Sequence, residues 1–395
     1  MKLTKNVLML ALMLTSLLLS AAPKMQDKLI LPEKIYAVPG IETNIYYANI
    51  FRTINPANYS FEFLCKKGNN DAKRWHFTPK KGEEGTYDVT LRVWDDDGVV
   101  AEAKSQLIVT PADAGKDKNL SIMIVGSSCI SMFHAYPTHI YNLFKTPGNP
   151  KLTMIGENGP RDKDKKLGEI RHEGYGGWSY HTFITKGRVR GKADNMRESP
   201  FWNFKTKQLD FAEYFRKNTN GKAPDIVTVS LGGNDMFRAQ DATMKEHVAG
   251  VKKNMITFFT ALRKAAPDAK VAIVLIDYAA TSQDAFGYNY GSTQTRWQFK
   301  KNYAAFIKMV QALVKEKPEL KLELVLLNGA VDNENNGHIY KMYPNARNKA
   351  TKVLFQANAL HPKPHGYQQG ADAFYCWMKY MLHRDEQAAK AAEKK

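Results

Sequence analysis

Two patterns of apolar and polar positions divide the chain. Residues 87–93 alternate strictly between the two kinds of side chain, and residues 99–109 continue as a β-rich run after an Asp-Gly turn. Strict period-two alternation is typical of a strand with one buried and one exposed face. Together with short runs at 29–31 and 45–50, it predicts an all-β sandwich of the Ig-like class over residues 23–112.

After residue 118 the pattern changes to apolar runs that alternate with helical periodicity. Buried strands are predicted at 120–125, 152–155, 225–231, 271–276 and 322–327, and helices at 130–144, 244–265, 299–315 and 366–382. Such alternation predicts βαβ units, and therefore an α/β domain with a parallel sheet flanked by helices over residues 119–384. Residues 113–118 are predicted to be a polar linker, and residues 385–395 a disordered basic tail.

The amino terminus has the pattern of a targeting segment. Lysines come first, residues 6–19 are almost wholly apolar, and small residues follow at 20–22. This order predicts a cleaved signal peptide over residues 1–22, and hence a secreted or periplasmic protein. An uncleaved anchor is the alternative. No other run approaches membrane length, so we expect no stable membrane insertion.

The charge balance bears on the partners. Lysine and arginine number 57 against 39 acidic residues, a formal net charge of +18. Basic surfaces attract nucleic acid, anionic membranes or acidic polymers. Because no nucleic-acid-binding module is visible, we expect anionic glycans or envelopes and no nucleic acid; a merely solvated basic surface is the alternative. Three cysteines without metal-site spacing predict no disulfide framework and no metal, and no cofactor is expected.

Candidate chemistry begins where the strand at 120–125 ends, at Gly126, Ser127 and Ser128. In open α/β sheets, ligands bind beyond the carboxyl ends of the strands, where Ser128 would lie. We therefore interpret Ser128 as a candidate nucleophile. A simple helix N-cap is the alternative, since serine is favoured at that position.

Three further stretches supply groups that complement a serine nucleophile. They are glycine-rich residues 172–179, residues 232–235 after the strand at 225–231, and residues 361–367 before the last helix. Acyl transfer needs a base, for which His361 is the candidate. It also needs donors for the developing oxyanion, which the backbone N–H groups of Ser128 and Gly177 and the side-chain amide of Asn234 could supply.

In this order, the four stretches resemble the four blocks of the GDSL or SGNH hydrolase family, which contribute Ser, Gly, Asn and His. The resemblance covers residues 120–382 and implies a flavodoxin-like, three-layer fold and ester hydrolysis through Ser128 and His361. Residues 173–178 and 199–203 further resemble secreted polysaccharide esterases of this family. The resemblance thus implies a serine esterase that removes short acyl groups, above all acetyl, from an acylated polysaccharide.

One departure from the family concerns the catalytic acid. The family has an acid three residues before the histidine, where this chain has Asn358. In serine proteases, replacing the equivalent Asp by Asn costs about 10⁴ in rate. Asn358 itself, Asp277 and Asp332 are therefore the candidates for orienting His361. Cys129 as nucleophile, in a Cys-His-Asn arrangement, is a further alternative.

The same stretches offer aromatic side chains for a sugar. Tyr175, Trp178 and Trp202 are expected to stack on sugar rings, with burial in the core as the alternative. Two other functions stay open, a glycan-binding protein with a degenerate site and a lipase or phospholipase that acts on anionic envelopes. The sequence leaves the oligomeric state open.

Overall fold

The computed structural model describes residues 24–131, 136–187 and 198–393. The predicted signal peptide at 1–22 lies outside these residues. No helix within the described part of the chain combines the length and apolarity needed to cross a membrane.

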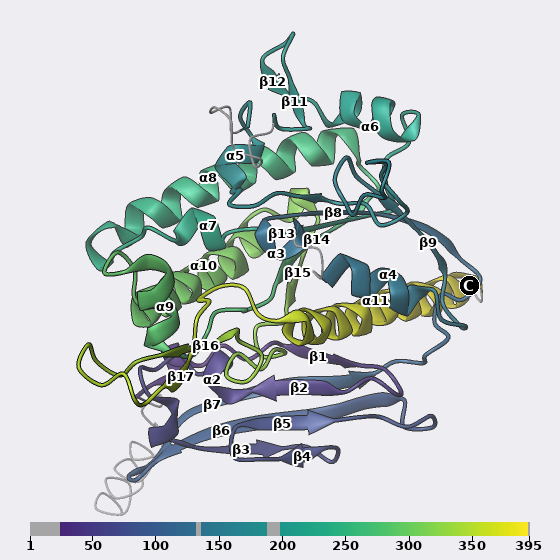
Figure 1. Cartoon of the computed structure of the whole chain (residues 1–395). Helices are drawn as coiled ribbons and strands as arrows, with labels where there is room; N and C mark the ends of the chain where they lie inside the picture. The colour runs from purple at the N-terminus through teal and green to yellow at the C-terminus, as the bar shows by residue number, and fades with distance from the viewer. Residues whose placement is uncertain (1–23, 132–135, 188–197, 394–395) are drawn as a thin grey trace, which may run out of the picture.

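A parallel sheet forms the centre of the larger part of the chain (Figure 1). Its strands run in the order β9, β8, β13, β14, β15, and the short β10 continues the β9 edge. All of its strand pairs are parallel, as the sequence predicted, and the order is the flavodoxin-like one. The strands are β8 (Asn119–Gly126), β9 (Lys151–Ile155), β10 (Glu173–Gly174), β13 (Ile226–Ser230), β14 (Lys270–Leu275) and β15 (Leu322–Leu326).

Helices cover both faces of this sheet, which makes a three-layer structure (Figure 1). The central strands are buried on both sides and therefore read as continuous apolar runs. On one face lie α6 (Phe211–Thr219), α8 (Met244–Ala265) and α10 (Arg296–Glu316). On the other lie α4 (Tyr136–Phe144) and α11 (Pro364–Glu393).

The amino-terminal part is built from two β-sheets with two clusters of buried apolar side chains. Buried Val89, Leu91 and Val93 alternate with more exposed residues along β6, as the sequence predicted. Trp75 of the smaller sheet packs in the same cluster as Val89 and Leu91. The Ig-like class stays a prediction. The larger sheet has the order β1 (Lys34–Ala37), β7 (Gly98–Val109), β6 (Gly85–Asp95), β3 (Ser60–Leu64), and the smaller β2 (Thr43–Tyr46), β5 (Arg74–Phe77), β4 (Asn69–Asn70).

The β-sheet part packs beneath α11 and the carboxyl ends of β14 and β15 (Figure 1). Arg52 Nη1 donates to Asp277 Oδ2 at 2.7 Å, and Asn49 Nδ2 donates to the Val331 carbonyl at 2.8 Å. The predicted linker at 113–118 forms turns that are held on α11, where Lys379 Nζ donates to the Ala114 carbonyl at 2.6 Å. The domain boundaries drawn from the sequence stay a prediction.

The prediction of a disordered tail is wrong for residues 385–393. Helix α11 runs on to Glu393, well beyond the predicted end at 382. Asp385 pairs with Lys270 at 2.6 Å, and Glu386 accepts a hydrogen bond from the Gly115 amide at 2.8 Å. These contacts anchor a segment that is rich in good helix formers.

The predicted helix at 130–144 appears as two elements, α3 (Ser128–Ser131) and α4, with residues 132–135 outside the described part. The other predicted helices and strands of the α/β part lie where the sequence placed them, to within a few residues at most ends. The remaining elements are short: α2 (Tyr47–Ile50), α5 (Tyr180–Phe183), α7 (Gly233–Met236), α9 (Gln283–Tyr290), β11 (Trp202–Asn203), β12 (Gln208–Leu209), β16 (Ile339–Met342) and β17 (Val353–Gln356).

The aromatic core beneath α8 supports a stability prediction. Phe258 is fully buried, so Phe258→Ala should lower the free energy of unfolding by about 3–5 kcal/mol, through lost burial and the cavity left behind. Phe204 is 46% exposed, and Phe204→Ala is the control, with little expected change. Denaturant unfolding measures both, and equal effects would contradict this description of the core. The rings around Phe258 are those of Tyr180, Phe183, Phe201, Phe211 and Phe259.

Candidate active site

Ser128 lies at the carboxyl edge of the parallel sheet, directly after β8. Gly126 pairs with Ser230 of β13, and a Cβ at Gly126 would approach Ile130 Cγ1 to 2.2 Å, so this position requires glycine. The chain then turns into α3, where the Ser127 carbonyl accepts hydrogen bonds from the amides of Ile130 and Ser131. This turn presents the Ser128 hydroxyl beyond the strand end, between β8 and β13.

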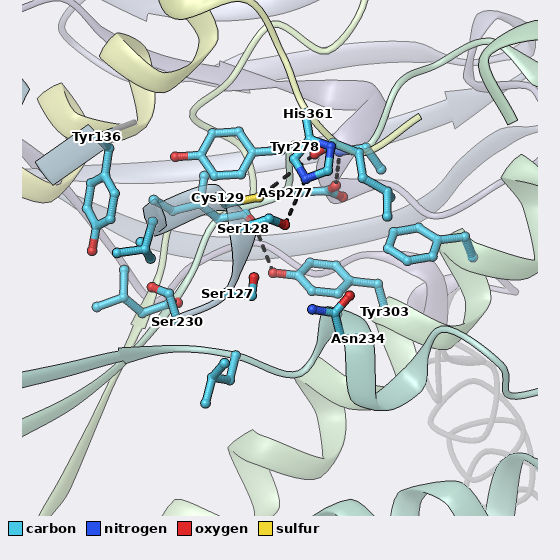
Figure 2. A pocket seen from close by; sticks show the side chains of 18 residues that line it. Ser127, Ser128, Cys129, Tyr136, Ser230, Asn234, Asp277, Tyr278, Tyr303 and His361 are labelled. Atoms are coloured by element: carbon cyan, nitrogen blue, oxygen red, sulfur yellow. Dashed lines mark hydrogen bonds between the residues drawn. The ribbon is translucent and has the colours of Figure 1, made fainter. Parts of the chain in front are cut away.

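His361 meets Ser128 from the segment that precedes α11. Its Nε2 lies 2.7 Å from Ser128 Oγ (Figure 2). Burial, followed by the nearby His338, lowers the pKa of His361 below its usual value of 6.5. The imidazole is therefore neutral at neutral pH and can accept the hydroxyl proton.

Asn234 faces the same region from α7, just after β13 (Figure 2). Its Nδ2 donates one hydrogen bond to the Trp178 carbonyl at 2.8 Å, and a side-chain amide has a second N–H to offer. Asp235 accepts from the Tyr180 amide at 3.0 and 3.2 Å, and burial raises the pKa of this carboxyl to about 6. These hydrogen bonds hold the segment that follows Gly177, residues 178–180, against α7.

Gly177 has a φ of 73°, in the left-handed region that favours glycine. Its loop is bonded to Asn234 through Trp178, but Gly177 does not line the cavity beside Ser128. The structure therefore brings Ser128, His361 and Asn234 to one cavity and places Gly177 in the adjoining loop.

The cavity beside Ser128 has a volume of about 90 Å³. Pockets for drug-sized ligands span roughly 300–1,000 Å³, so this one suits a small group. Its lining is mostly apolar apart from the three site residues, a few serines and one buried carboxylate. The lining includes Ser127, Ser128, Ser230, Asn234, Ile276, Asp277, Tyr278, Phe299, Tyr303 and His361.

Comparison with known families decides the classification. Residues 173–369 match the model of the GDSL-like lipase/acylhydrolase family, a match that includes Gly177, Asn234 and His361. The chain belongs to this family. It is an ester hydrolase. The match begins after Ser128, so the role of that serine rests on its position beside His361.

Solved structures are similar to the hydrolase only at a distance. A carbohydrate acetylesterase family member from Sinorhizobium meliloti shares 12% identity, with 67% of this chain and 99% of that chain covered, at a TM-score of 0.40. A family two carbohydrate esterase from Clostridium thermocellum, in complex with cellohexaose, shares 13%, with 88% and 94% covered, at a TM-score of 0.36. An M. smegmatis aryl esterase shares 9%, with 66% and 99% covered, at 0.39. No curated protein matches the chain.

Asn358 does not orient the imidazole of the hydrolase, contrary to one sequence-based expectation. Its Oδ1 accepts hydrogen bonds from the amides of Leu360 and His361, at 3.2 and 3.0 Å. Asparagine commonly caps a turn in this way. Asn358 therefore positions the main chain at His361.

The two other residues that were candidates for orienting His361, Asp277 and Asp332, form hydrogen bonds with other partners. Asp277 accepts from Arg52 through Oδ2 and from the Ala279 amide through Oδ1 at 3.0 Å. Asp332 accepts amide hydrogen bonds at 2.9 and 3.0 Å within its own turn. Within the described residues, no hydrogen bond reaches His361 Nδ1.

The expectation that Tyr175 and Trp178 stack on sugar is wrong, because both side chains belong to the core. Trp178 is fully buried and Tyr175 is 6% exposed, with their ring centroids 4.4 Å apart. The Tyr175 hydroxyl donates to Glu173 Oε2 at 2.5 Å, and burial raises the pKa of that carboxyl to about 7. Trp202 is half-buried in β11 and does not line the Ser128 cavity.

Cys129 is a poor nucleophile in this setting. Burial raises the pKa of its thiol to about 12, so the reactive thiolate is scarce at neutral pH. Its Sγ donates to the Leu360 carbonyl at 3.8 Å. Ser128, which contacts His361 directly, is the better candidate.

Arg52 is the residue near the site that sequence reasoning missed. It comes from the β-sheet part, 225 positions before the Asp277 that it binds. No local motif marks such a pair, because only the packing of the two parts brings it together. No cluster of three or more His, Cys, Asp or Glu side chains that could hold a metal occurs among the described residues.

The contacts of Asn358 lead to a kinetic prediction. Asn358→Asp should change kcat on an aryl acetate by less than about threefold, because an aspartate oxygen can keep the cap without reaching Nδ1. If residue 358 instead contacted Nδ1 as the catalytic acid does in a triad, Asn358→Asp should raise kcat by a large part of the roughly 10⁴-fold that the Asp-to-Asn change costs serine proteases. A gain of about 100-fold or more would contradict the capping role.

Proposed function

We propose that this ester hydrolase is a secreted serine esterase that removes acetyl or similarly short acyl groups from a polysaccharide. One observation carries the proposal, the 2.7 Å contact between Ser128 Oγ and His361 Nε2 at the wall of a small cavity. A serine hydroxyl becomes a competent nucleophile when a neutral base accepts its proton. The sequence pattern of residues 1–22 supports secretion.

In the first half of the proposed reaction, Ser128 is acylated. The Oγ lone pair forms a bond to the ester carbonyl carbon while His361 Nε2 takes the hydroxyl proton. The carbonyl electron pair moves onto oxygen, where the amide of Ser128 and the second Nδ2 hydrogen of Asn234 stabilise it. When the carbonyl re-forms, the bond to the sugar oxygen breaks and that oxygen takes the proton from His361.

The second half repeats these steps with water. His361 Nε2 takes a proton from a water molecule, whose oxygen attacks the acyl carbon on Ser128. The same donors stabilise the oxyanion, and the bond to Oγ breaks as Oγ recovers the proton from Nε2. The products are a carboxylic acid and the free sugar hydroxyl.

This dyad relies on a fixed backbone to place the imidazole. The Asn358 cap holds the His361 amide, and Pro362 and Pro364 restrict the chain that follows. A charged partner on Nδ1 would also stabilise the imidazolium, so we expect slower turnover than in a full triad.

The proposed preference for short acyl groups rests on the cavity. A long acyl chain needs a deep apolar groove, whereas the cavity beside Ser128 measures about 90 Å³. The larger group of the ester, the sugar, would remain outside it. This argues against a lipase or phospholipase specialised for long chains.

The direct test compares wild type with Ser128→Ala. On an aryl acetate and on acetylated oligosaccharides, the substitution should lower kcat by about 10⁴-fold or more, because the covalent route is lost. Ser131→Ala removes a hydroxyl from the same helix and should retain activity. Equal turnover by wild type and Ser128→Ala would refute the mechanism.

The pKa of His361 gives a second test. Because burial lowers this pKa, the base form persists below pH 6.5, and kcat/KM should rise with a midpoint below 6.5 and stay level through pH 7. A carboxylate partner would raise the pKa of the imidazole. A midpoint clearly above 6.5 would therefore contradict a site without an acid on Nδ1.

A further inference from the structure

A second, larger cavity lies between the β-sheet part and the α/β part. Its volume is about 1200 Å³, slightly above the usual range for ligand pockets. It shares four lining residues with the Ser128 cavity, which are Asp277, Ala279, Phe299 and Tyr303. The two cavities are therefore neighbours.

Arg52 lines this large cavity with an incomplete set of hydrogen bonds. Its side chain is only 5% exposed, and Nη1 is paired with Asp277 at 2.7 Å. Nε and Nη2 are buried and have no partner among the described residues. Buried donors without acceptors are costly and rare, so this guanidinium has capacity for a further acceptor. It lies over the Tyr303 ring, at 5.7 Å from the centroid.

Lys300 brings a second cation to the same wall from α10. Its Nζ donates to the Thr53 carbonyl at 3.2 Å, and within the described residues it has no ion pair. Burial, then the charge of Arg52, lowers the pKa of Lys300 to about 7, and Arg296 acts in the same direction. Asp277 opposes this shift, but its charge is already balanced by Arg52.

Two of the carboxylates that line the large cavity already have basic partners. Glu334 pairs with Lys73 at 2.7 Å, and Asp71 lies 3.1 Å from His76 Nε2 and 3.9 Å from Arg74 Nε. Asp332 lines the cavity as well and accepts amide hydrogen bonds within its own turn. Arg52 keeps two buried donors that have no partner among the described residues.

We propose that Arg52 and Lys300 bind an anionic group of the substrate, a carboxylate or a sulfate ester, so that the hydrolase acts on an acidic polysaccharide. This inference rests on the proposed function, since it names the sugar class that the esterase takes. Guanidinium and ammonium groups form strong, charge-assisted hydrogen bonds with such anions. The formal net charge of +18 would also favour the approach of an acidic polymer.

The kinetic test uses matched acetylated oligosaccharides that are neutral, uronate-containing or sulfated. For wild type, kcat/KM on at least one anionic substrate should exceed kcat/KM on the neutral substrate by about tenfold or more. Comparing the uronate-containing with the sulfated substrate shows whether the site prefers a carboxylate or a sulfate. Lys300→Met should reduce this preference by about tenfold, the scale of one charge-assisted hydrogen bond. Lys300→Arg, which keeps the charge, should retain most of it.

The matched control is Lys315→Met, which removes one exposed lysine from the same helix and leaves the cavity lining intact. It should behave as wild type. A wild-type preference near one, or an equal loss in Lys300→Met and Lys315→Met, would overturn the proposal. Active wild type without an anionic preference would refute only the anion site, whereas wild type inactive on every ester, aryl acetate included, would refute the proposed function.

A binding measurement on Ser128→Ala tests the anion site without turnover. By titration calorimetry, the deacetylated uronate or sulfated oligosaccharide should bind more tightly than the neutral one. The charged groups that act on Lys300 are Arg52, Arg296 and Asp277. Because Lys300 loses its charge as the pH rises through about 7, binding should weaken between pH 6 and pH 8. Equal affinities for charged and neutral sugars would contradict the site.

Discussion

The candidate site depends on the parallel pairing of β8 with β13. This register sets Gly126 beside Ser230, so that both strands end at the same edge and the turns that follow present Ser128 and Asn234 to a common space. In the flavodoxin-like order, β8 and β13 are the strands between which connections leave in opposite directions, and a crevice forms there. His361 lies in the segment just before α11. Because α11 packs against the sheet, this segment reaches the crevice and His361 contacts Ser128.

A second constraint joins the β-sheet part to this edge. The buried pair between Arg52 and Asp277 places a residue from early in the chain next to the wall of the Ser128 cavity. Buried ion pairs contribute little net stability but are costly to break. The pair is thus one of the contacts that join the two parts, and the proposed anion site with Lys300 lies at that junction. The β-sheet part would then contribute to substrate recognition as well as to packing.

The sequence predicted those elements whose apolar pattern extends over many neighbouring residues. It failed where contacts between residues far apart in the chain determine the structure. Helix α8 and the alternation along β6 follow from periodicity, and Ser128 and Asn234 from their places after apolar strands. Trp178 looked available for a sugar because a glycine-rich loop surrounds it, yet the ring fills the core. Asp277 was one of three candidates for orienting His361, and the side chain that it binds, Arg52, lies 225 positions away. The lysine-rich tail was predicted to be disordered, because its contacts with Lys270 and Gly115 join residues that are remote in sequence and leave no local pattern.

In the proposed mechanism, Ser128 is the nucleophile and His361 activates it. Mass-spectrometric mapping after treatment with a fluorophosphonate tests it most directly, because the reagent forms a covalent adduct only with an activated serine. We predict one adduct per chain, on the peptide that carries Ser128, with labelling strongly slowed in His361→Ala. An adduct on another residue, or full esterase activity in protein that takes up no label, would contradict this role of Ser128.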